Sequence, residues 1–338
     1  MLSIETLEIR NLLSGYTIMD LTATSGSNFF AADLNDQGMV AGRCGDKELP
    51  CLFDGHGFRM LALPLTLAGG SPLSINNDGN MAGVGRGTDS TSHAIFWDQE
   101  GAVDLGNIPG QDISVGYIND ANTIVGVYVT GVRHPDFTAV IWHPYRDPEL
   151  IPHLAPTSIN DAGQISGEYR VAPDQFQPVI YENGTPDALP DAGFGGATVK
   201  INSQGDVAGL VNDGSGQSQA VVWLQGKLTE IGVAGYASAV NDADQVVGAG
   251  MLQRDFLWQG DQPQDLNDLA PLPGWTFEGG GSINNAGQIL VSGRNDQKNI
   301  SHSFLLTPDA SGMPSWLGWA LRQVQKHQEA QWGPDTST

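Results

Sequence analysis

The chain has 338 residues, of which 40% are hydrophobic, and its 38 acidic and 15 basic residues give a formal net charge of −23. So acidic a protein repels phosphate backbones and anionic bilayers, which excludes nucleic acid and membrane surfaces as expected partners. No apolar run approaches the ~20 residues that a membrane-spanning helix needs.

Residues 1–15 are interpreted as a lead-in to the folded part of the chain. The stretch from Met1 to Leu13 carries Glu5, Glu8 and Arg10 among its apolar residues. It has no basic segment followed by an apolar block and a small-residue cleavage site, as a secretory signal peptide would. We therefore expect a cytoplasmic protein if Met1 is the native start. The alternative is an extracellular or periplasmic protein from which a signal peptide was removed.

The two cysteines, Cys44 and Cys51, flank a six-residue stretch that is typical of a hairpin loop. A hairpin would bring them face to face, which allows a disulfide and would indicate an oxidising compartment. The alternative is two small buried thiols. Two ligands fall short of the four that a structural zinc ion needs, so no metal site is expected.

One phrase recurs seven times along the chain: an aliphatic residue, an asparagine, a turn, and a short apolar strand that ends near a glycine. The intervals between the asparagines are 39 to 43 residues, which is typical of a four-stranded propeller blade. The asparagines are Asn35, Asn76, Asn119, Asn160, Asn202, Asn241 and Asn284.

The turn after each asparagine predicts a hairpin between the first two strands of a blade, a and b. Three residues after the asparagine stand residue types that tolerate positive φ: Gly38, Gly79, Asn122, Gly163, Gly205, Asp244 and Gly287. A third strand, c, and a fourth, d, follow in each repeat; in the second repeat they are expected at 94–97 and 102–106.

The two ends of the repeat region complement each other. The seventh repeat stops after its third strand, at 303–306, and an isolated strand at 16–21 precedes the first repeat. This strand resembles a d strand and would complete the last blade, hiding both sheet edges. The sequence therefore predicts an all-β, seven-bladed β-propeller over residues 16–308. An open solenoid and a six-bladed ring with a spare repeat are the alternatives.

Two further phrases carry a family resemblance. The third strand begins with His-Ala-Ile-Phe at 93–96 and His-Ser-Phe at 302–304, and the turn reads Asn-Asp-Ala-Gly at 160–163. The repeats resemble the bacterial HAF-repeat family, named for a His-Ala-Phe phrase, over about residues 16 to 308. The resemblance implies a β-propeller of a family labelled extracellular. It implies no shared reaction, since propellers host enzymes, receptors and scaffolds.

The residue two before each asparagine is expected to face the central channel, because side chains alternate along a strand. Small residues prevail at this position, but Asp33, Tyr117 and Lys200 depart from the pattern. They are candidate catalytic residues, with Lys200 receiving an anionic group and the other two acting in acid–base steps. The alternative is an internal salt bridge. His134, on the longest b–c loop, is a further acid–base candidate.

The b–c and d–a loops are expected to form the mouth of the site. Several b strands and the longest b–c loop carry arginines, which would suit an anion-binding mouth, and a long d–a loop carries a tryptophan. These ligand-binding candidates are Arg43, Arg86, Arg133, Arg170, Arg294 and Trp275. Ion pairing with neighbouring carboxylates is the alternative for the arginines. His93 and His302 occupy equivalent repeat positions and are interpreted as structural, and turn capping is taken to explain the asparagines fully.

Residues 309–338 form a tail with a different pattern. Leu317, Leu321 and Val324 recur at helical spacing between residues 315 and 331, which predicts an amphipathic helix. The helix is interpreted as packed on the propeller, with a protein partner or dimer contact as the alternative.

The sequence thus leaves two functions open. The first is a propeller that binds a small molecule or peptide at the channel mouth on the long-loop face. The second is a cofactor-independent lyase, isomerase or cyclase that uses the same mouth. Nucleophile, phosphate-loop and metal-binding motifs do not occur in the sequence, and no cofactor is expected.

Overall fold

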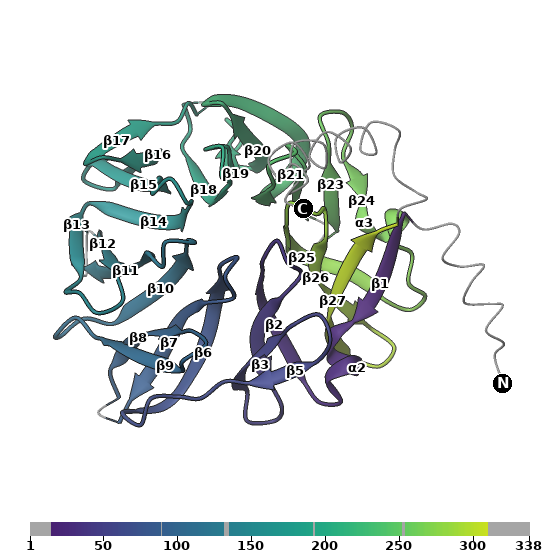
Figure 1. The fold of residues 1–338 in the computed structure, drawn as a ribbon. Coiled ribbons are helices and arrows are strands. Elements are labelled where there is room, and N and C mark those ends of the chain that lie inside the picture. Colours follow the sequence, from purple (N-terminus) through teal and green to yellow (C-terminus); the bar gives the residue numbers. More distant parts are fainter. Residues whose placement is uncertain (1–14, 89, 132–134, 192, 252–253, 310–338) are drawn as a thin grey trace, which may run out of the picture.

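The structure is a computed structural model that describes residues 15–88, 90–131, 135–191, 193–251 and 254–309. The predicted C-terminal helix lies outside the described residues. The described chain is almost entirely β, with two short helices, α2 (Leu21–Ser25) and α3 (Leu266–Leu269). Antiparallel sheets stand around a central channel like the blades of a propeller (Figure 1).

The first four sheets in chain order have four strands each, and each sheet is made of consecutive strands. They comprise β2 (Phe29–Leu34), β3 (Val40–Cys44), β4 (Leu49–Phe53) and β5 (Phe58–Met60); β6 (Leu67–Ile75), β7 (Met81–Gly87), β8 (Ser92–Trp97) and β9 (Ala102–Gly106); β10 (Ile113–Ile118), β11 (Ile124–Thr130), β12 (Asp136–Trp142) and β13 (Glu149–Pro152); and β14 (Leu154–Ile159), β15 (Ile165–Ala172), β16 (Gln175–Glu182) and β17 (Thr185–Ala188).

A seven-stranded sheet comes next. It comprises β18 (Gly196–Ile201), β19 (Val207–Asn212), β20 (Ser218–Leu224), β21 (Lys227–Val240), β22 (Val246–Gly250), β23 (Asp255–Trp258) and β24 (Gln264–Asp265). The long strand β21 pairs with β20 through residues 227–234 and with β22 through residues 235–240. It is therefore the outer strand of one ladder and the inner strand of the next.

The last sheet joins the two ends of the described chain, which lie side by side in Figure 1. Its strands, in spatial order, are β1 (Tyr16–Asp20), β27 (Ile300–Pro308), β26 (Ile289–Asn295) and β25 (Thr276–Ile283). The register runs from Tyr16 opposite Pro308 to Asp20 opposite Phe304. This pairing confirms the predicted closure of the last repeat by the N-terminal strand, which is one residue shorter than expected because Leu21 begins α2.

A contact between the third and fourth strands supports the assignment of β1 as a d strand. His302 Nδ1 lies 2.8 Å from Asp20 Oδ2. The equivalent residues of other sheets make the same contact, at 2.9 Å between His93 and Asp104 and 2.6 Å between Arg254 and Asp265. His93 and His302 are thus engaged with carboxylates of their own sheets, in accord with their interpretation as structural residues.

The seven repeat asparagines are all buried, and the turns after them are confirmed as predicted. The residue three after each has positive φ, for example 77° at Gly38, 59° at Asn122 and 58° at Asp244. The side-chain oxygen of Asn160 accepts a hydrogen bond from the backbone N–H of Gln164 at 3.0 Å, which caps the turn.

Turn capping alone does not explain the asparagines, and that interpretation was wrong. Each side-chain amide also donates to the backbone carbonyl of the next asparagine in the chain, at 2.9–3.1 Å. The last bond runs from Asn284 to Asn35 and closes the ring at 2.9 Å. The asparagines therefore join neighbouring sheets to one another, as well as shaping each turn.

Replacing Asn160 with alanine is expected to lower the free energy of unfolding by about 1–3 kcal/mol, because a buried acceptor and a buried donor lose their partners. The acceptor is the carbonyl of Asn202, 3.0 Å away, and the donor is the amide of Gln164. Urea denaturation of Asn160→Ala beside the wild type measures this. A loss below about half a kcal/mol would contradict a structural role for the ring.

The cysteines form a disulfide between Cys44 on β3 and Cys51 on β4. Both residues are buried. Of the two alternatives, the bridge across the hairpin is the one that the structure has.

Candidate functional site

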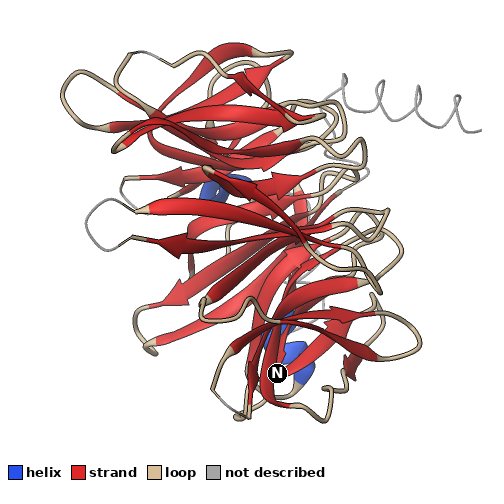
Figure 2. Cartoon of the chain, turned by 90° about the vertical axis from the view of Figure 1, so that its left-hand side faces the viewer, coloured by secondary structure: helices blue, strands red, loops and turns tan. Residues whose placement is uncertain are grey.

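The strand ends form two faces of the molecule, which appear as loops at the two ends of the strands in Figure 2. The Asn face carries the a–b turns that follow the seven asparagines, together with the c–d turns. The loop face carries the b–c and d–a connections, such as residues 45–48 and 61–66.

Two cavities lie along the channel between these faces. The Asn-side cavity, of about 150 Å³, is lined by the seven asparagines and the residues around them. The loop-side cavity, of about 210 Å³, is lined by residues nearer the start of the a strands, such as Ala31, Val199 and Gly281. Asp33, Tyr117 and Lys200 line both cavities, so these three side chains stand between them.

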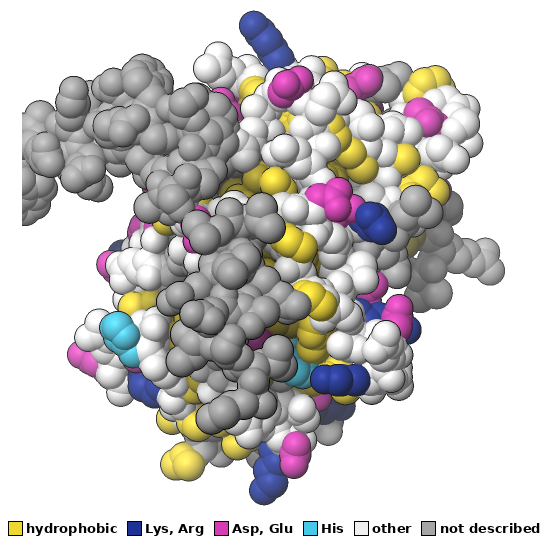
Figure 3. Space-filling model, turned by 90° about the vertical axis from the view of Figure 1, so that its right-hand side faces the viewer, with side chains coloured by type: hydrophobic (Ala, Val, Ile, Leu, Met, Phe, Trp, Pro, Cys, Tyr) yellow, Lys and Arg dark blue, Asp and Glu magenta, His cyan; other side chains and the backbone are white. Residues whose placement is uncertain are grey.

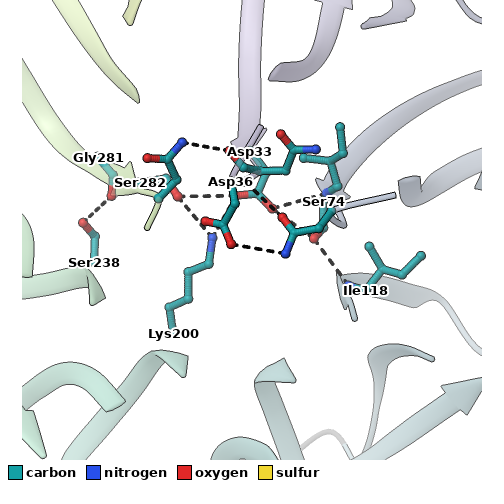
Figure 4. A network of polar contacts seen from close by, with 12 residues as sticks. Asp33, Asp36, Ser74, Ile118, Lys200, Ser238, Gly281 and Ser282 are labelled. Atoms are coloured by element: carbon teal, nitrogen blue, oxygen red, sulfur yellow. Dashed lines mark hydrogen bonds and ion pairs between the residues drawn. The ribbon is translucent and has the colours of Figure 1, made fainter. Parts of the chain in front are cut away.

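The structure brings these three residues together from β2, β10 and β18, as the channel-facing register predicted. Lys200 Nζ lies 2.9 Å from Asp33 Oδ1 and donates a second hydrogen bond to Ser282 Oγ at 3.1 Å (Figure 4). The same nitrogen lies 5.4 Å from the centre of the Tyr117 ring, in a cation–π contact. Ala239, also expected at the channel, lines neither cavity and is packed in the core, where its methyl group does not reach the lumen.

The carboxylate of Asp33 is held on both sides. Its second oxygen accepts hydrogen bonds from Ser74 Oγ at 3.0 Å and from the backbone N–H of Ile75 at 3.3 Å. Only 4% of the residue is exposed. The Asp33 side of the ion pair is therefore buried and geometrically fixed, while the side chain of Lys200 is 20% exposed at the cavity. This arrangement favours the internal salt bridge among the interpretations of these residues.

Electrostatics keep Lys200 and Tyr117 protonated at neutral pH. Burial lowers the pKa of Lys200, but the neighbouring Asp33 carboxylate outweighs burial, so the pKa is raised. Burial raises the pKa of Tyr117 more than the charge of Lys200 lowers it. Lys200 is thus an ammonium and Tyr117 a neutral phenol, and both act as hydrogen-bond donors rather than as proton acceptors.

The Asn-side cavity is rimmed by the residue that follows each asparagine. These residues are Asp36, Asn77, Asp120, Asp161, Ser203, Asp242 and Asn285. The amides of Asn77 and Asn285 both donate to Asp36 Oδ2, at 3.2 and 3.0 Å. Burial, together with Asp120 and Asp36, raises the pKa of Asp161. Four carboxylates on one rim disfavour the entry of anions from this face.

The structure does not assemble the predicted arginines around the channel. Arg43 pairs with Glu48, Arg170 with Asp136 at 3.2 Å, and Arg294 with Asp296 at 2.7 Å. Arg86 is exposed on β7. None of these four lines either cavity. Figure 3 shows the same arrangement on one side of the molecule, where basic side chains lie beside acidic ones.

Of the remaining predicted site residues, Trp275 is not at the channel. Trp275 packs against His302 and Phe304, with ring centroids 4.6 and 5.0 Å apart, and it belongs to the core of the last sheet. Arg133 and His134 lie outside the described residues.

Exposed apolar side chains concentrate on the loop face. Of the twelve large hydrophobic side chains that are exposed within the described ranges, ten lie on b–c or d–a connections or at the strand ends beside them, and only Tyr145 lies on a turn of the Asn face. The ten are Met19, Phe30, Leu49, Met60, Leu65, Val129, Val171, Phe194, Met251 and Ile300.

Sequence reasoning missed Asp255, on β23. Its exposed fraction is 0%, and Oδ1 accepts a hydrogen bond from the backbone N–H of Gly280 at 2.7 Å. Oδ2 has no hydrogen-bond partner in the described structure. Burial raises the pKa of this carboxyl to about 7. A signal was present, because the other third strands carry small or uncharged residues at this position: Cys51, Ala94, Ala139, Pro178, Ala220 and Ser303.

Among the residues that the structure describes, no group of three or more His, Cys, Asp or Glu side chains is arranged to hold a metal ion. No helix in the same part of the chain is long and apolar enough to cross a membrane.

No family model and no curated protein matches the sequence. Solved structures do match. An oligogalacturonate lyase from Vibrio parahaemolyticus is similar with a TM-score of 0.58 and 11% identity, over 88% of this chain and 94% of that chain. YCF48 bound to D1 peptide is similar with a TM-score of 0.51 and 12% identity, over 87% of this chain and 96% of that chain.

The β-propeller domain of the Trilobed protease from Pyrococcus furiosus is similar with a TM-score of 0.57 and 11% identity, over 82% of this chain and 95% of that chain. Identities this low establish the fold alone: this chain is a β-propeller. The Pyrococcus domain is described as having an open velcro topology, whereas β1 here pairs with β27 in the last sheet.

Proposed function

We propose that this chain is a seven-bladed β-propeller that binds a peptide on its loop face, with one neutral hydrogen-bond-accepting group of the peptide held in the loop-side cavity. The seven-fold count is supported by the closed ring of seven asparagines and by β21, which serves two ladders. We also propose that residues 16–308 form the propeller and that the chain is related to the HAF-repeat proteins. The repeat phrases of the sequence support both proposals.

The donors at the floor of the loop-side cavity carry this proposal. In the described contacts, Lys200 uses two of its three N–H groups, and the hydroxyl of Tyr117 makes no described hydrogen bond. Because Asp33 neutralises the ammonium, the floor offers donors without a net charge. A carbonyl or hydroxyl oxygen would gain hydrogen bonds there. A carboxylate would gain them too, but it would also be repelled by the negative charge of Asp33.

The size of the cavity and its surroundings favour a peptide over a free small molecule. Drug-sized ligands occupy pockets of about 300–1,000 Å³, and the loop-side cavity has about 210 Å³. One side chain or one backbone segment fills it. The exposed apolar residues of the loop face, such as Phe194 and Val171, line neither cavity. A molecule confined to the cavity would not contact them, whereas a polypeptide that crosses the loop face would. The similar propeller YCF48 was solved with a bound peptide.

The enzymatic alternative has less support. A lyase, isomerase or cyclase of this kind needs a group that removes a proton, and the raised pKa values of Lys200 and Tyr117 make both poor bases. The third candidate, Asp33, has both carboxylate oxygens engaged by Lys200, Ser74 and the backbone of Ile75. The alternative therefore rests on His134.

We also propose an oxidising location for the protein, extracellular or periplasmic, in place of the cytoplasm. The support is the disulfide between Cys44 and Cys51, since such bonds persist mainly outside reducing compartments.

A titration with three small probes tests the proposed ligand chemistry. The probes are N-acetylglycinamide, acetate and methylammonium, which are neutral, anionic and cationic, each added to about 10 mM and followed by backbone amide NMR. We expect the neutral probe to shift the amides of Lys200, Gly281 and Ser282 and the charged probes to leave them unmoved. The variant Tyr117→Phe is expected to lower the affinity for the neutral probe at least threefold, because one hydrogen-bond donor is removed.

The matched control is Tyr145→Phe, because Tyr145 is exposed on the Asn face and 78% accessible. It should leave the titration unchanged. Stronger shifts with acetate or methylammonium, or no shift at the cavity with any probe, would contradict the proposed ligand class.

A further inference from the structure

The inner strand of the last sheet differs from the other inner strands. In those strands the pairing register slips by one residue near the channel, as between Ala31 and Asp33. In β25 the slip lies between Glu278 and Ser282, so that three consecutive glycines, Gly279 to Gly281, stand opposite Val291 alone. Their φ angles of 100° at Gly279 and 75° at Gly280 are in the region that favours glycine. We call residues 279–281 the glycine bulge.

Three side chains of the neighbouring strands hold the backbone of the glycine bulge. Tyr236 donates its hydroxyl hydrogen to the carbonyl of Gly279 at 2.7 Å, and Ser238 donates to the carbonyl of Gly281 at 2.5 Å. Asp255 accepts from the N–H of Gly280 at 2.7 Å. A side chain at Gly280 would bring its Cβ within 3.0 Å of the Tyr236 hydroxyl, so the fit is close on this side.

The glycine bulge leads directly to the proposed site. Gly280, Gly281 and Ser282 line the loop-side cavity, and Ser282 Oγ accepts a hydrogen bond from Lys200 Nζ. Figure 4 shows the sequence of contacts from Ser238 through Gly281 and Ser282 to Lys200 and Asp33. The position of the bulge therefore sets the position of one partner of Lys200.

We propose that Tyr236, Ser238 and Asp255 are positioning residues for the loop-side cavity, and that Asp255 makes the position of the glycine bulge depend on pH. The neutral carboxyl of Asp255 holds the bulge in the arrangement seen here. Its ionised form draws water toward the unpartnered oxygen and loosens the bulge. The consequence for ligand binding rests on the proposed function, whereas the coupling between Asp255 and the bulge does not.

Within the described part of the chain, no positive charge faces Asp255 to compensate its ionisation. The charged and titratable groups that face it are Tyr236 on β21, Glu278 on β25, and Asp265 beside Arg254. Burial raises its pKa, the amide of Gly280 lowers it, and Glu278 and Asp265 raise it further, to about 7. The guanidinium of Arg254 is taken up by Asp265 at 2.6 Å. Ionisation thus creates a buried charge with one hydrogen bond, which is costly unless the site opens.

NMR titration from about pH 5 to about pH 9 tests the proposal. The ¹³C chemical shift of the Asp255 carboxyl and the amide chemical shifts of Gly280 and Ser282 should change together with pH, with one midpoint near pH 7. Asp255→Asn should abolish the movement at Gly280 and Ser282. Asp255→Ser copies the residue of the next third strand, Ser303, and provides a second non-titrating variant if Asn is poorly tolerated. The amide of Gly163, on a distant turn, is the internal control.

A carboxyl midpoint near 4, or movement of Gly280 without Ser282, would overturn the proposal. The same titration in the presence of N-acetylglycinamide separates it from the proposed function. We expect wild-type affinity for this probe to fall at least threefold above about pH 8 and the affinity of Asp255→Asn to stay constant. Coupled shifts without probe binding would refute the proposed function and leave the positioning role standing.

Discussion

Removing residues 1–21 is expected to lower the free energy of unfolding by about 3–6 kcal/mol, because the truncation takes two buried side chains out of the core. Tyr16 is 7% exposed and Leu21 0%. The truncation also removes the contact between Asp20 and His302 and leaves β27 as an unpaired edge in the last sheet. Since every sheet contacts its neighbours around the ring, we expect one cooperative transition at a lower urea midpoint.

A second truncation, of residues 1–14, is the matched control, because it retains β1 and Leu21. Any difference between the two truncations is then assigned to residues 15–21. If both truncated proteins unfold at the same urea midpoint, the pairing of β1 with β27 contributes nothing to the stability of the ring. That result would contradict the assignment of β1 as the missing fourth strand.

Replacing Lys200 with methionine is expected to lower the free energy of unfolding by about 3–5 kcal/mol, because it leaves a buried carboxylate without its counter-ion. Methionine preserves most of the stem of the lysine, so the loss comes from the charge. Asp33 would keep its hydrogen bonds from Ser74 and Ile75 but lose the ammonium 2.9 Å away. Chemical denaturation at neutral pH gives the value.

Two controls make this result specific. Lys227→Met changes an exposed lysine at the start of β21, beside a c–d turn, and should stay within about half a kcal/mol of the wild type. The double variant Asp33→Asn, Lys200→Met removes both charges and should recover most of the lost stability. If the single variant is as stable as the wild type, the pair does not form in solution and the channel is not divided as the structure has it.

The sequence alone was sufficient for much of the fold. The spacing of the asparagines, the positive-φ residues after them and the orphan strand at 16–21 predicted the hairpins and the pairing of β1 with β27. The asparagine phrase and its turn are local features that recur seven times along the chain, and the orphan strand stands beside a repeat that lacks its fourth strand. The convergence of Asp33, Tyr117 and Lys200 followed from strand alternation plus ring closure.

Contacts between repeats were harder to predict. The asparagine side chains reach the next repeat, about 40 residues away in the chain, and nothing in the local phrase distinguishes such a bond from simple turn capping. The arginines were expected at a common mouth, but each of Arg43, Arg170 and Arg294 finds a carboxylate nearby, which only the loop geometry decides. Asp255 was overlooked because its role depends on Gly280, in the following repeat.

The most direct measurement of the proposed site is a crystal structure of the protein soaked with N-acetylglycinamide. We expect the probe in the loop-side cavity, with one carbonyl oxygen about 3 Å from Lys200 Nζ and within hydrogen-bonding reach of the Tyr117 hydroxyl. A probe bound instead among Asp36, Asp120 and Asp242 on the Asn face, or a loop-side cavity that remains empty at saturating probe, would contradict the account.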